Sequence, residues 1–390
     1  MKILIIGSGV SAIEAYKLAL RVNDIPTLLI GENEIENVIG FTYILNDNLK
    51  ENINNYDLFV LSPGVYYDDY RLILLKNRNK KIISEIEYAY IHIKEKPLII
   101  AVTGSNGKTS IVEHLYYVFK KLNYPVKKGG NIGIALSSLA DNLKKDQILI
   151  VEVSNFQLDH IVTFKPDISI ITNITPNHLD RVKDFNAYQN SKLRIYKNMN
   201  INDDLIYLDT IDNIILFLGN KHIIKDQNNH LVNNKLIVKK VFEILNIIVE
   251  EQLINSFKGV EYRLQKLNDF IYHDGKSTTP SSTYNAIKTI NNEKNIILII
   301  GGRNKKLSFS KILELKLQKI IVYGELAKEL FSDSLIKVKT LKEAIDKFDT
   351  IRNKDSILLY SPGCTSFDQY KNYIERCKEF EQLIREKGYV

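Results

Sequence analysis

The chain contains no tryptophan, only two cysteines and no long apolar run. Cys364 and Cys377 are too few for a disulfide framework or a four-cysteine metal site, so we expect two free thiols in a reducing compartment. No segment provides the roughly 18 consecutive apolar residues that a membrane-spanning helix needs. The start, MKILIIGSGV, enters a strand directly and lacks the charged and cleavable parts of an export signal. The sequence therefore predicts a cytoplasmic protein without a membrane segment.

A concentrated block of basic residues is also missing, although the net charge is +7. Lysines spread through the chain favour anionic ligands in general rather than a nucleic acid, which we do not expect as a partner. Hydrophobic residues make up 45% and charged residues 25% of the chain, which is typical of globular proteins. At about 150 residues per domain, a chain of 390 residues predicts two to three domains.

Apolar strands alternate with helical patterns along the whole chain, as in KILIIG followed by SAIEAYKLALRV. Such alternation predicts parallel sheets covered by helices. We predict three consecutive α/β domains at 1–94, 95–258 and 259–390, the first and third Rossmann-like and the second related to P-loop ATPases. One helix is expected over about 235 to 256, and Gly259 is a suitable place to leave it.

The strongest local motif is LIIAVTGSNGKTS, in which a strand runs through a glycine turn into a helix. Gly104 and Gly107 let the backbone N–H groups face an anion, and the start of the helix adds favourable partial charge. Lys108 can then reach the terminal phosphates, and the Thr109 hydroxyl can bind Mg²⁺. The motif is a shortened P-loop and predicts a nucleoside triphosphate site.

Two further polar residues follow predicted strands downstream of this loop. Glu152 ends ILIVE, and His178 follows IITNITPN. Ligands gather at the carboxyl ends of strands in open parallel sheets. Oxygen ligands with an occasional imidazole suit Mg²⁺ that is bound partly through phosphate. Glu152 and His178 are therefore candidate ligands of a Mg²⁺ ion beside the P-loop.

Several segments in a fixed order carry a family resemblance. They are TGSNGKTS, EVSNFQLD, NITPNHLDR, SKLRIY, DGKSTTPSST and SPGCTSFDQYKNYIERCKEF. Together they resemble the Mur ligase superfamily over nearly the whole chain. The S-x-F-Q-L segment and the segment around SFDQYKNY point to the branch that adds D-glutamate.

This resemblance implies an ATP-dependent carboxylate–amine ligase. It would add D-glutamate to UDP-N-acetylmuramoyl-L-alanine through an acyl phosphate, in the synthesis of peptidoglycan precursors for cell wall, shape and division. ATP would be a substrate, Mg²⁺ the metal, and Lys192 would carry a carbamate. The family further implies a cytoplasmic enzyme that we expect to be a monomer.

The resemblance also assigns site residues, position by position. As catalytic residues it implies Lys108, His178, Lys192 and Lys276. As ATP-binding residues it implies Gly104, Ser105, Asn106, Gly107, Lys108, Thr109, Ser110, Asn131, Arg263 and Asp274. For the UDP substrate it implies Gly9, Val10, Ser11, Ser62 and Gly64, and for D-glutamate Lys276, Thr278, Ser366, Phe367 and Tyr373. As metal ligands it implies Thr109, Glu152, His178 and Lys192.

The sequence departs from the family pattern at several points. Tyr262 stands where the family has histidine before Arg263, Asn155 replaces a serine, and Glu32 and Asn33 stand where a Thr-Arg pair is usual. The third-domain loop reads GGRNK in place of the family's usual G-x-D/N-K-x pattern. Among the functions that the resemblance implies, recognition of the uridine nucleotide is the one that these departures affect most.

Three other functions compete with this interpretation. They are another ligase of the superfamily, such as a folylpolyglutamate synthase; a homologue that binds nucleotide without ligating; and a dinucleotide-dependent oxidoreductase. The last rests on Gly7-x-Gly9-x-x-Ala12 after a strand, with Glu32 as a ribose ligand. It leaves the second phosphate loop unexplained and is the least favoured.

Overall fold

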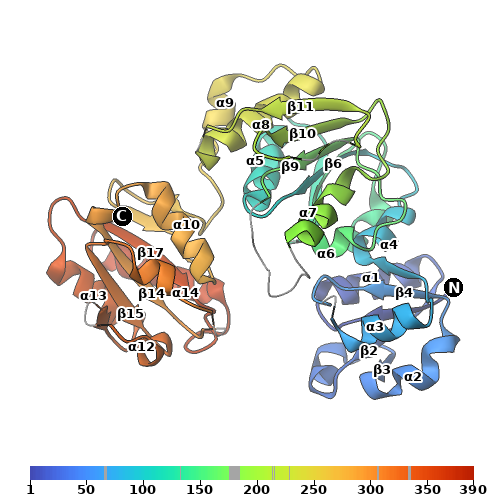
Figure 1. The fold of residues 1–390 in the computed structure, drawn as a ribbon, viewed down its shortest axis with the longest axis horizontal. Coiled ribbons are helices and arrows are strands. Elements are labelled where there is room, and N and C mark those ends of the chain that lie inside the picture. Colours follow the sequence, from blue (N-terminus) through green and yellow to red (C-terminus); the bar gives the residue numbers. More distant parts are fainter. Residues whose placement is uncertain are drawn as a thin grey trace. The chain divides into compact units, whose positions relative to one another are not determined.

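The computed structural model describes residues 1–65, 68–131, 133–174, 185–212, 214, 216–227, 229–304, 307–332 and 335–390. The chain divides into two compact units, Met1–Phe257 and Lys258–Val390 (Figure 1). Each unit is described by itself. Among the described residues, no helix is both long and apolar enough to span a bilayer.

The first sheet lies at the start of the first unit and is parallel throughout, with strand order β3-β2-β1-β4-β5. Its elements are β1 (Lys2–Ile6), α1 (Val10–Arg21), β2 (Ile25–Ile30), η1 (Glu32–Val38), β3 (Tyr43–Leu45), η2 (Asn46–Asn48), α2 (Leu49–Asn52), η3 (Ile53–Asn55), β4 (Leu58–Leu61), α3 (Tyr70–Asn77), β5 (Ile82–Ser84) and α4 (Glu85–Ile91). Ile3 and Ile5 enter one buried cluster and Leu4 and Ile6 another, because successive side chains of a strand point to opposite faces. Both faces of this sheet are therefore covered.

A second parallel sheet completes the first unit, with order β11-β10-β9-β6-β8-β7. Its elements are β6 (Leu98–Thr103), α5 (Lys108–Lys121), β7 (Val126–Gly130), η4 (Leu136–Ser138), η5 (Ala140–Asn142), β8 (Ile148–Glu152), α6 (Asn155–Leu158), β9 (Ile168–Ile171), α7 (Phe185–Leu193), η6 (Arg194–Tyr196), β10 (Asp204–Leu208), β11 (Asn220–Ile224), α8 (His230–Ile244) and α9 (Glu251–Asn255). The strand β6 lies between β8 and β9, so the loop that follows it is at the middle of the sheet.

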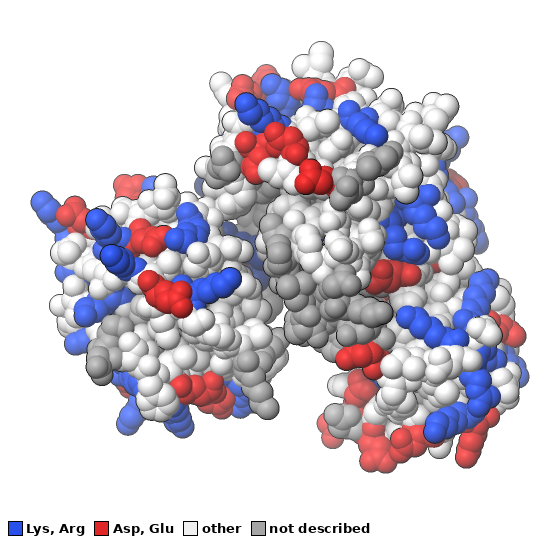
Figure 2. Space-filling view, in the orientation of Figure 1, with Lys and Arg blue, Asp and Glu red and all other residues white. Residues whose placement is uncertain are grey.

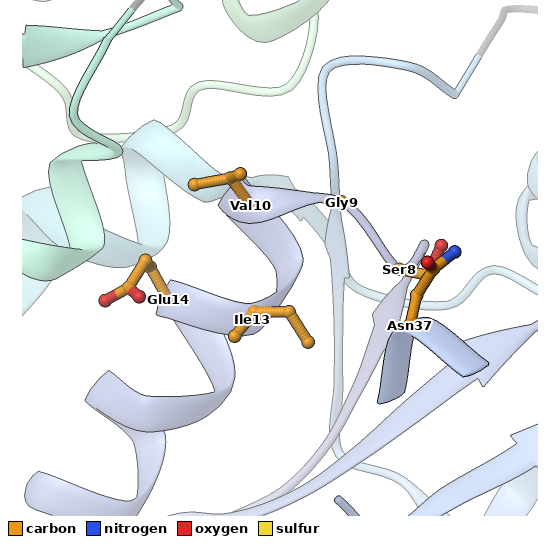
Figure 3. Close-up of a pocket in the computed structure, with 6 residues that line it drawn as sticks. All are labelled: Ser8, Gly9, Val10, Ile13, Glu14 and Asn37. Atoms are coloured by element: carbon orange, nitrogen blue, oxygen red, sulfur yellow. The ribbon is translucent and has the colours of Figure 1, made fainter. Parts of the chain in front are cut away.

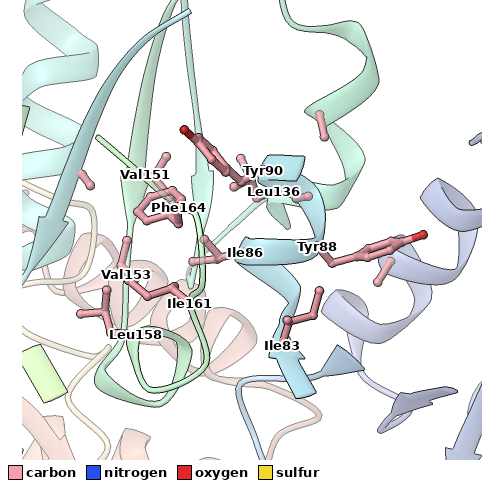
Figure 4. Packing of buried hydrophobic residues seen from close by; sticks show 14 of the residues in the cluster. Ile83, Ile86, Tyr88, Tyr90, Leu136, Val151, Val153, Leu158, Ile161 and Phe164 are labelled. Carbon is pink, nitrogen blue, oxygen red and sulfur yellow. The ribbon is translucent and has the colours of Figure 1, made fainter. Parts of the chain in front are cut away.

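The helix α4 joins these two sheets. Its side chains Ile86 and Tyr90 belong to the same buried cluster as Val151 and Phe164 of the second sheet region (Figure 4). Glu87 accepts hydrogen bonds from the backbone N–H groups of Thr163 and Phe164 at 2.7 and 2.8 Å. A buried carboxylate is stable there because it is hydrogen-bonded to backbone donors.

The second unit holds a mixed sheet of order β12-β13-β17-β14-β15-β16, in which only the β12–β13 pair is antiparallel among the described strands. Its elements are β12 (Gln265–Lys266), β13 (Ile271–His273), α10 (Pro280–Ile290), η7 (Glu293–Asn295), β14 (Ile296–Gly301), α11 (Ser310–Leu313), β15 (Lys319–Tyr323), α12 (Leu326–Glu329), β16 (Leu335–Lys337), α13 (Leu341–Ile351), β17 (Ile357–Gly363) and α14 (Tyr373–Glu386). The strands β14 and β17 are almost fully buried.

The predicted α/β class with parallel sheets is thus confirmed. The three domain boundaries stay a prediction, since the first two sheets share one compact unit. The single helix expected over 235 to 256 is wrong. Asn246 adopts a left-handed φ of 54° and separates α8 from α9, which is a usual way for a helix to end.

On the visible face of each unit, Lys and Arg are interspersed with Asp and Glu (Figure 2).

Candidate functional site

The glycine turn after β6 has the conformation that the P-loop motif predicts. Gly104 and Gly107 have φ values of 146° and 82°, a region in which side chains other than glycine are strained. A Cβ added to Gly104 would lie 1.9 Å from Oγ1 of Thr172, so no larger residue fits. Lys108 Nζ donates to the carbonyl oxygens of Gly104 and Ser105 at 2.8 and 3.2 Å. Lys108 therefore lies against the glycine loop, where it is predicted to contact a phosphate of the nucleotide.

Thr109 and Glu152 meet beside this loop, although 43 residues separate them. The Thr109 hydroxyl donates to Oε2 of Glu152 at 2.8 Å, and the Asn131 side-chain amide donates to Oε1 at 3.2 Å. Glu152 ends β8, next to β6, and is only 1% exposed. Thr109, Glu152 and Gly129 are among the residues that line a small cavity of about 110 Å³. Carboxylate, hydroxyl and amide oxygens of this kind are suitable Mg²⁺ ligands.

Lys192 is the third charged residue at the loop, and it is buried with 1% of its surface exposed. Its Nζ donates to the Gly104 carbonyl at 2.8 Å and lies 4.5 Å from the centre of the Tyr188 ring. Burial, and then the charge of Lys108, lower the pKa of Lys192 well below its usual value. Low dielectric surroundings favour the neutral amine. His178, predicted to belong to the same cluster, lies outside the described residues.

The first sheet carries its own ligand-sized cavity at the turn between β1 and α1. Its volume is about 450 Å³, and its lining residues are Ser8, Gly9, Val10, Ile13, Glu14 and Asn37 (Figure 3). Ser8 donates to Glu34 at 2.6 Å, so Glu34, and not the exposed Glu32, is the carboxylate bonded to this turn. Nearby, Ser62 Oγ is buried and has no partner among the described residues, and it lies 3.0 Å from the position of a Cβ added to Gly7.

In the second unit, the residues predicted for ATP and D-glutamate come from four places: Arg263 precedes β12, Asp274, Lys276 and Thr278 follow β13, Ser366 and Phe367 follow β17, and Tyr373 begins α14. Lys276 Nζ lies 6.0 Å from the centre of the Tyr373 ring. Ser366 is buried, Thr278 is partly exposed and Phe367 is 60% exposed. Both carboxylate oxygens of Asp274 accept hydrogen bonds from residues of the same unit.

Sequence reasoning missed Arg376, which is fully buried in α14. Its guanidinium donates to the carbonyl oxygens of Gly275, Cys364 and Gly301, at 3.3, 3.1 and 3.4 Å. Gly275 and Cys364 lie in the loops that carry predicted D-glutamate residues, and Gly301 is the last residue of β14. The only sequence signal was an arginine at a helix position that otherwise faces the core.

The structure therefore assembles one group of predicted residues at the P-loop, a second at the β1–α1 turn and a third within the second unit. The first group consists of Gly104, Ser105, Asn106, Gly107, Lys108, Thr109, Ser110, Asn131, Glu152 and Lys192.

Comparison with known proteins identifies the family. Residues 102–257 match the Mur ligase middle domain. A UDP-N-acetylmuramoylalanine–D-glutamate ligase of Francisella tularensis subsp. novicida (strain U112) is 32% identical over 389 residues, covering 90% of this chain and 91% of that protein. This chain belongs to the same ligase family. Another protein of that name, from Thermoanaerobacter sp. (strain X514), is 30% identical over 452 residues and covers 99% and 98%.

Solved structures of other Mur ligases have the same fold. MurF of Thermotoga maritima, in complex with ADP, matches with a TM-score of 0.61 and 14% identity over 93% of this chain and 94% of its own. The UDP-N-acetylmuramate–alanine ligase of the same organism matches with a TM-score of 0.57 and 18% identity over 99% and 100%. The predicted superfamily and branch are confirmed by the match to the Mur ligase middle domain and by the two relatives named above.

Proposed function

We propose that this Mur ligase uses ATP to join the amine of D-glutamate to the L-alanine carboxylate of UDP-N-acetylmuramoyl-L-alanine. Its family makes it an ATP-dependent ligase of peptidoglycan precursor synthesis. The observation that carries the proposal is the near-complete match to ligases of that name, together with Lys108, Thr109 and Glu152 at one phosphate loop.

The reaction has two steps. A carboxylate oxygen bonds to the γ-phosphorus of ATP, the bond to the bridging oxygen breaks and ADP leaves. The neutral amine of D-glutamate then attacks the acyl carbon, inorganic phosphate leaves and the amine loses its proton. Because the first step brings two anions together, the loop N–H groups and Lys108 must stabilise the charge.

Thr109, Glu152, His178 and a carbamylated Lys192 would hold Mg²⁺. The described members of this set fit, since Glu152 is buried beside a hydroxyl and Lys192 lies in surroundings that favour a neutral amine. A neutral amine can attack CO₂, forming an N–C bond and releasing its proton, which yields an anionic oxygen ligand. Bound there, Mg²⁺ would offset the negative charge of the phosphates.

The other proposed contacts, to the UDP part of the substrate, D-glutamate and ATP, involve residues of both units. Gly9, Val10, Ser11, Ser62 and Gly64 would bind the UDP part of the substrate at the 450 Å³ cavity and its neighbouring strand end. Lys276, Thr278, Ser366, Phe367 and Tyr373 would bind D-glutamate, because an ammonium group and hydroxyls suit a dicarboxylate. Arg263 and Asp274, as the family resemblance implies, would bind ATP. We further propose a cytoplasmic monomer that binds no nucleic acid.

The proposal is tested by phosphate release from ATP with the purified chain, Mg²⁺ and UDP-N-acetylmuramoyl-L-alanine. D-glutamate is compared with L-glutamate, L-lysine and diaminopimelate, and the product is identified by its mass. We expect release and product only with D-glutamate. A diamino acid as the best substrate would place the chain in another branch. No release with any amino acid, despite measurable ATP binding, would indicate a homologue that binds without ligating.

A further inference from the structure

A short turn before β12 is held in an unusual backbone conformation. Tyr262 and Leu264 have φ values of 61° and 44°, although neither is glycine, and Arg263 lies between them. The turn is closed by a 3.0 Å hydrogen bond from the N–H of Arg263 to the carbonyl of Val260. Residues with side chains adopt left-handed values at a cost, and they persist there when their surroundings fix them.

Asp274 is what fixes the turn at Leu264. Its Oδ1 accepts the N–H of Leu264 at 3.0 Å, and its Oδ2 accepts the hydroxyl of Ser361 at 2.6 Å. The residue is 4% exposed, and its own N–H donates to the carbonyl of Tyr360 in β17 at 2.7 Å. The carboxylate thus faces the interior of the second unit, and burial raises its pKa to about 6.

A second hydrogen bond fixes the turn at Tyr262. The N–H of Lys276 donates to the Tyr262 carbonyl at 3.0 Å. The Tyr262 ring is buried, with its centre 4.9 Å from that of the His273 ring. The turn that carries Arg263 and the loop that carries Lys276 are therefore tied to each other as well as to Asp274.

We propose that Asp274 is a positioning residue. Its buried carboxylate locks the backbone of the turn Tyr262–Leu264 and so keeps Arg263 and Lys276 in fixed positions relative to each other. The inference rests on the proposed function, because it takes Arg263 as an ATP contact and Lys276 as a D-glutamate contact. It assigns Asp274 an indirect role toward ATP in place of the direct contact that the family resemblance implies. Loss of the lock should therefore impair the use of both substrates.

The kinetic test uses Asp274→Ala and Asp274→Asn, with Asp269→Asn as the control because Asp269 is fully exposed. KM is measured separately for ATP, 2′-deoxy-ATP, 3′-deoxy-ATP and D-glutamate. We expect Asp274→Ala to raise KM for ATP and for D-glutamate by about tenfold or more, since it leaves buried donors without an acceptor. The asparagine variant should lose less, because its amide oxygen can still accept the Leu264 N–H. A rise for ATP alone that disappears with a deoxy-ATP would show a direct ribose contact and overturn the proposal.

Hydrogen–deuterium exchange over residues 258–268 gives a readout that needs no ligase activity. We expect these amides to be protected in the wild type, to lose protection in Asp274→Ala and to keep most of it in Asp274→Asn. Unchanged exchange in the alanine variant would overturn the lock. If that variant does not fold, Asp274→Asn carries the kinetic test, since its amide oxygen keeps one acceptor for the Leu264 N–H. Asp274→Asn should then raise both KM values severalfold, and unchanged values for both would overturn the proposal. Protection that depends on Asp274 in a chain inactive with D-glutamate would reject the proposed substrate and leave the lock standing.

Discussion

The hydroxyl of Thr109 donates a 2.8 Å hydrogen bond to the carboxylate of Glu152. The two residues come from the first turn of α5 and the end of β8, which flanks β6 in the sheet. This hydrogen bond brings a hydroxyl and a carboxylate together beside the phosphate loop. Groups that are held in place by such contacts can stabilise developing charge effectively.

We therefore expect Thr109→Ala to lower kcat/KM for ATP by about 100-fold or more, and Lys108→Ala to do the same. Each change would remove a group that we propose to contact phosphate or metal, and neither residue belongs to the hydrophobic clusters. Phosphate release measures the effect, and Thr109→Ser, which keeps the hydroxyl, should lose less. Lys120→Ala, on the exposed part of the same helix, is the control. Near-wild-type turnover in Lys108→Ala would reject the P-loop interpretation.

Lys192→Ala should be nearly inactive, and acetate should restore part of the activity by returning an anionic oxygen to the vacated space. The reason is that the buried amine lies at the Gly104 carbonyl, where a carbamate could reach the proposed metal site. A carbamate signal from ¹³C-labelled bicarbonate should be present in the wild type and absent from the variant. Lys197→Ala, an exposed lysine close by in sequence, should keep the signal. Full activity of Lys192→Ala would contradict the assignment.

The sequence predicted the parts of the fold that depend on local pattern. Alternating apolar strands and helices predicted the parallel sheets, and the glycines at 104 and 107 predicted the loop, because only glycine suits those φ values. The break at Asn246 was missed because asparagine is also tolerated inside a helix. The burial of Lys192 could not be predicted, since it depends on how α7 packs against a loop 88 residues away.

The direction in which side chains point was the second feature that could not be predicted from the sequence. Both Glu32 and Glu34 follow β2, and the sequence pointed to Glu32 only as a ribose ligand in the dinucleotide alternative, whereas it is Glu34 that bonds to Ser8. The reason is that η1 turns Glu34 back toward the turn and leaves Glu32 in solvent. Asp274 likewise follows a strand directly, as ligand residues often do, yet both of its carboxylate oxygens accept hydrogen bonds within the unit. A strand-end carboxylate can be located from sequence, but its partners depend on the surrounding turns.

Lys276→Met should raise KM for D-glutamate by about tenfold or more and change KM for the UDP substrate little. The ammonium group is expected to pair with a substrate carboxylate, and charge-assisted hydrogen bonds are stronger than neutral ones. Steady-state kinetics with each substrate varied in turn provides the measurement. Lys266→Met is a suitable control, because Lys266 is exposed and pairs with Asp269. Equal rises for all substrates would instead indicate a general structural defect.

The last prediction concerns Glu85, which joins the two sheets of the first unit. Its Oε1 accepts the backbone N–H of Ser137 at 2.7 Å, while its Oε2 is buried without a partner among the described residues. Burial raises the pKa of Glu85 from 4.5 to about 7. The folded chain therefore binds a proton here that the unfolded chain has lost between about pH 4.5 and 7.

It follows that this group makes the first unit less stable as the pH rises through that window. Glutamine is neutral at every pH and keeps an oxygen for Ser137, so Glu85→Gln should gain stability relative to wild type at pH 8 and little at pH 5. We expect the gain at pH 8 to be on the order of 1–3 kcal/mol. Urea unfolding of both proteins at the two pH values measures it, with the exposed Glu95→Gln as control. Because other groups titrate equally in both proteins, their effects cancel in the difference. A difference between Glu85→Gln and wild type that does not vary with pH would show that Glu85 is ionised in the folded chain throughout.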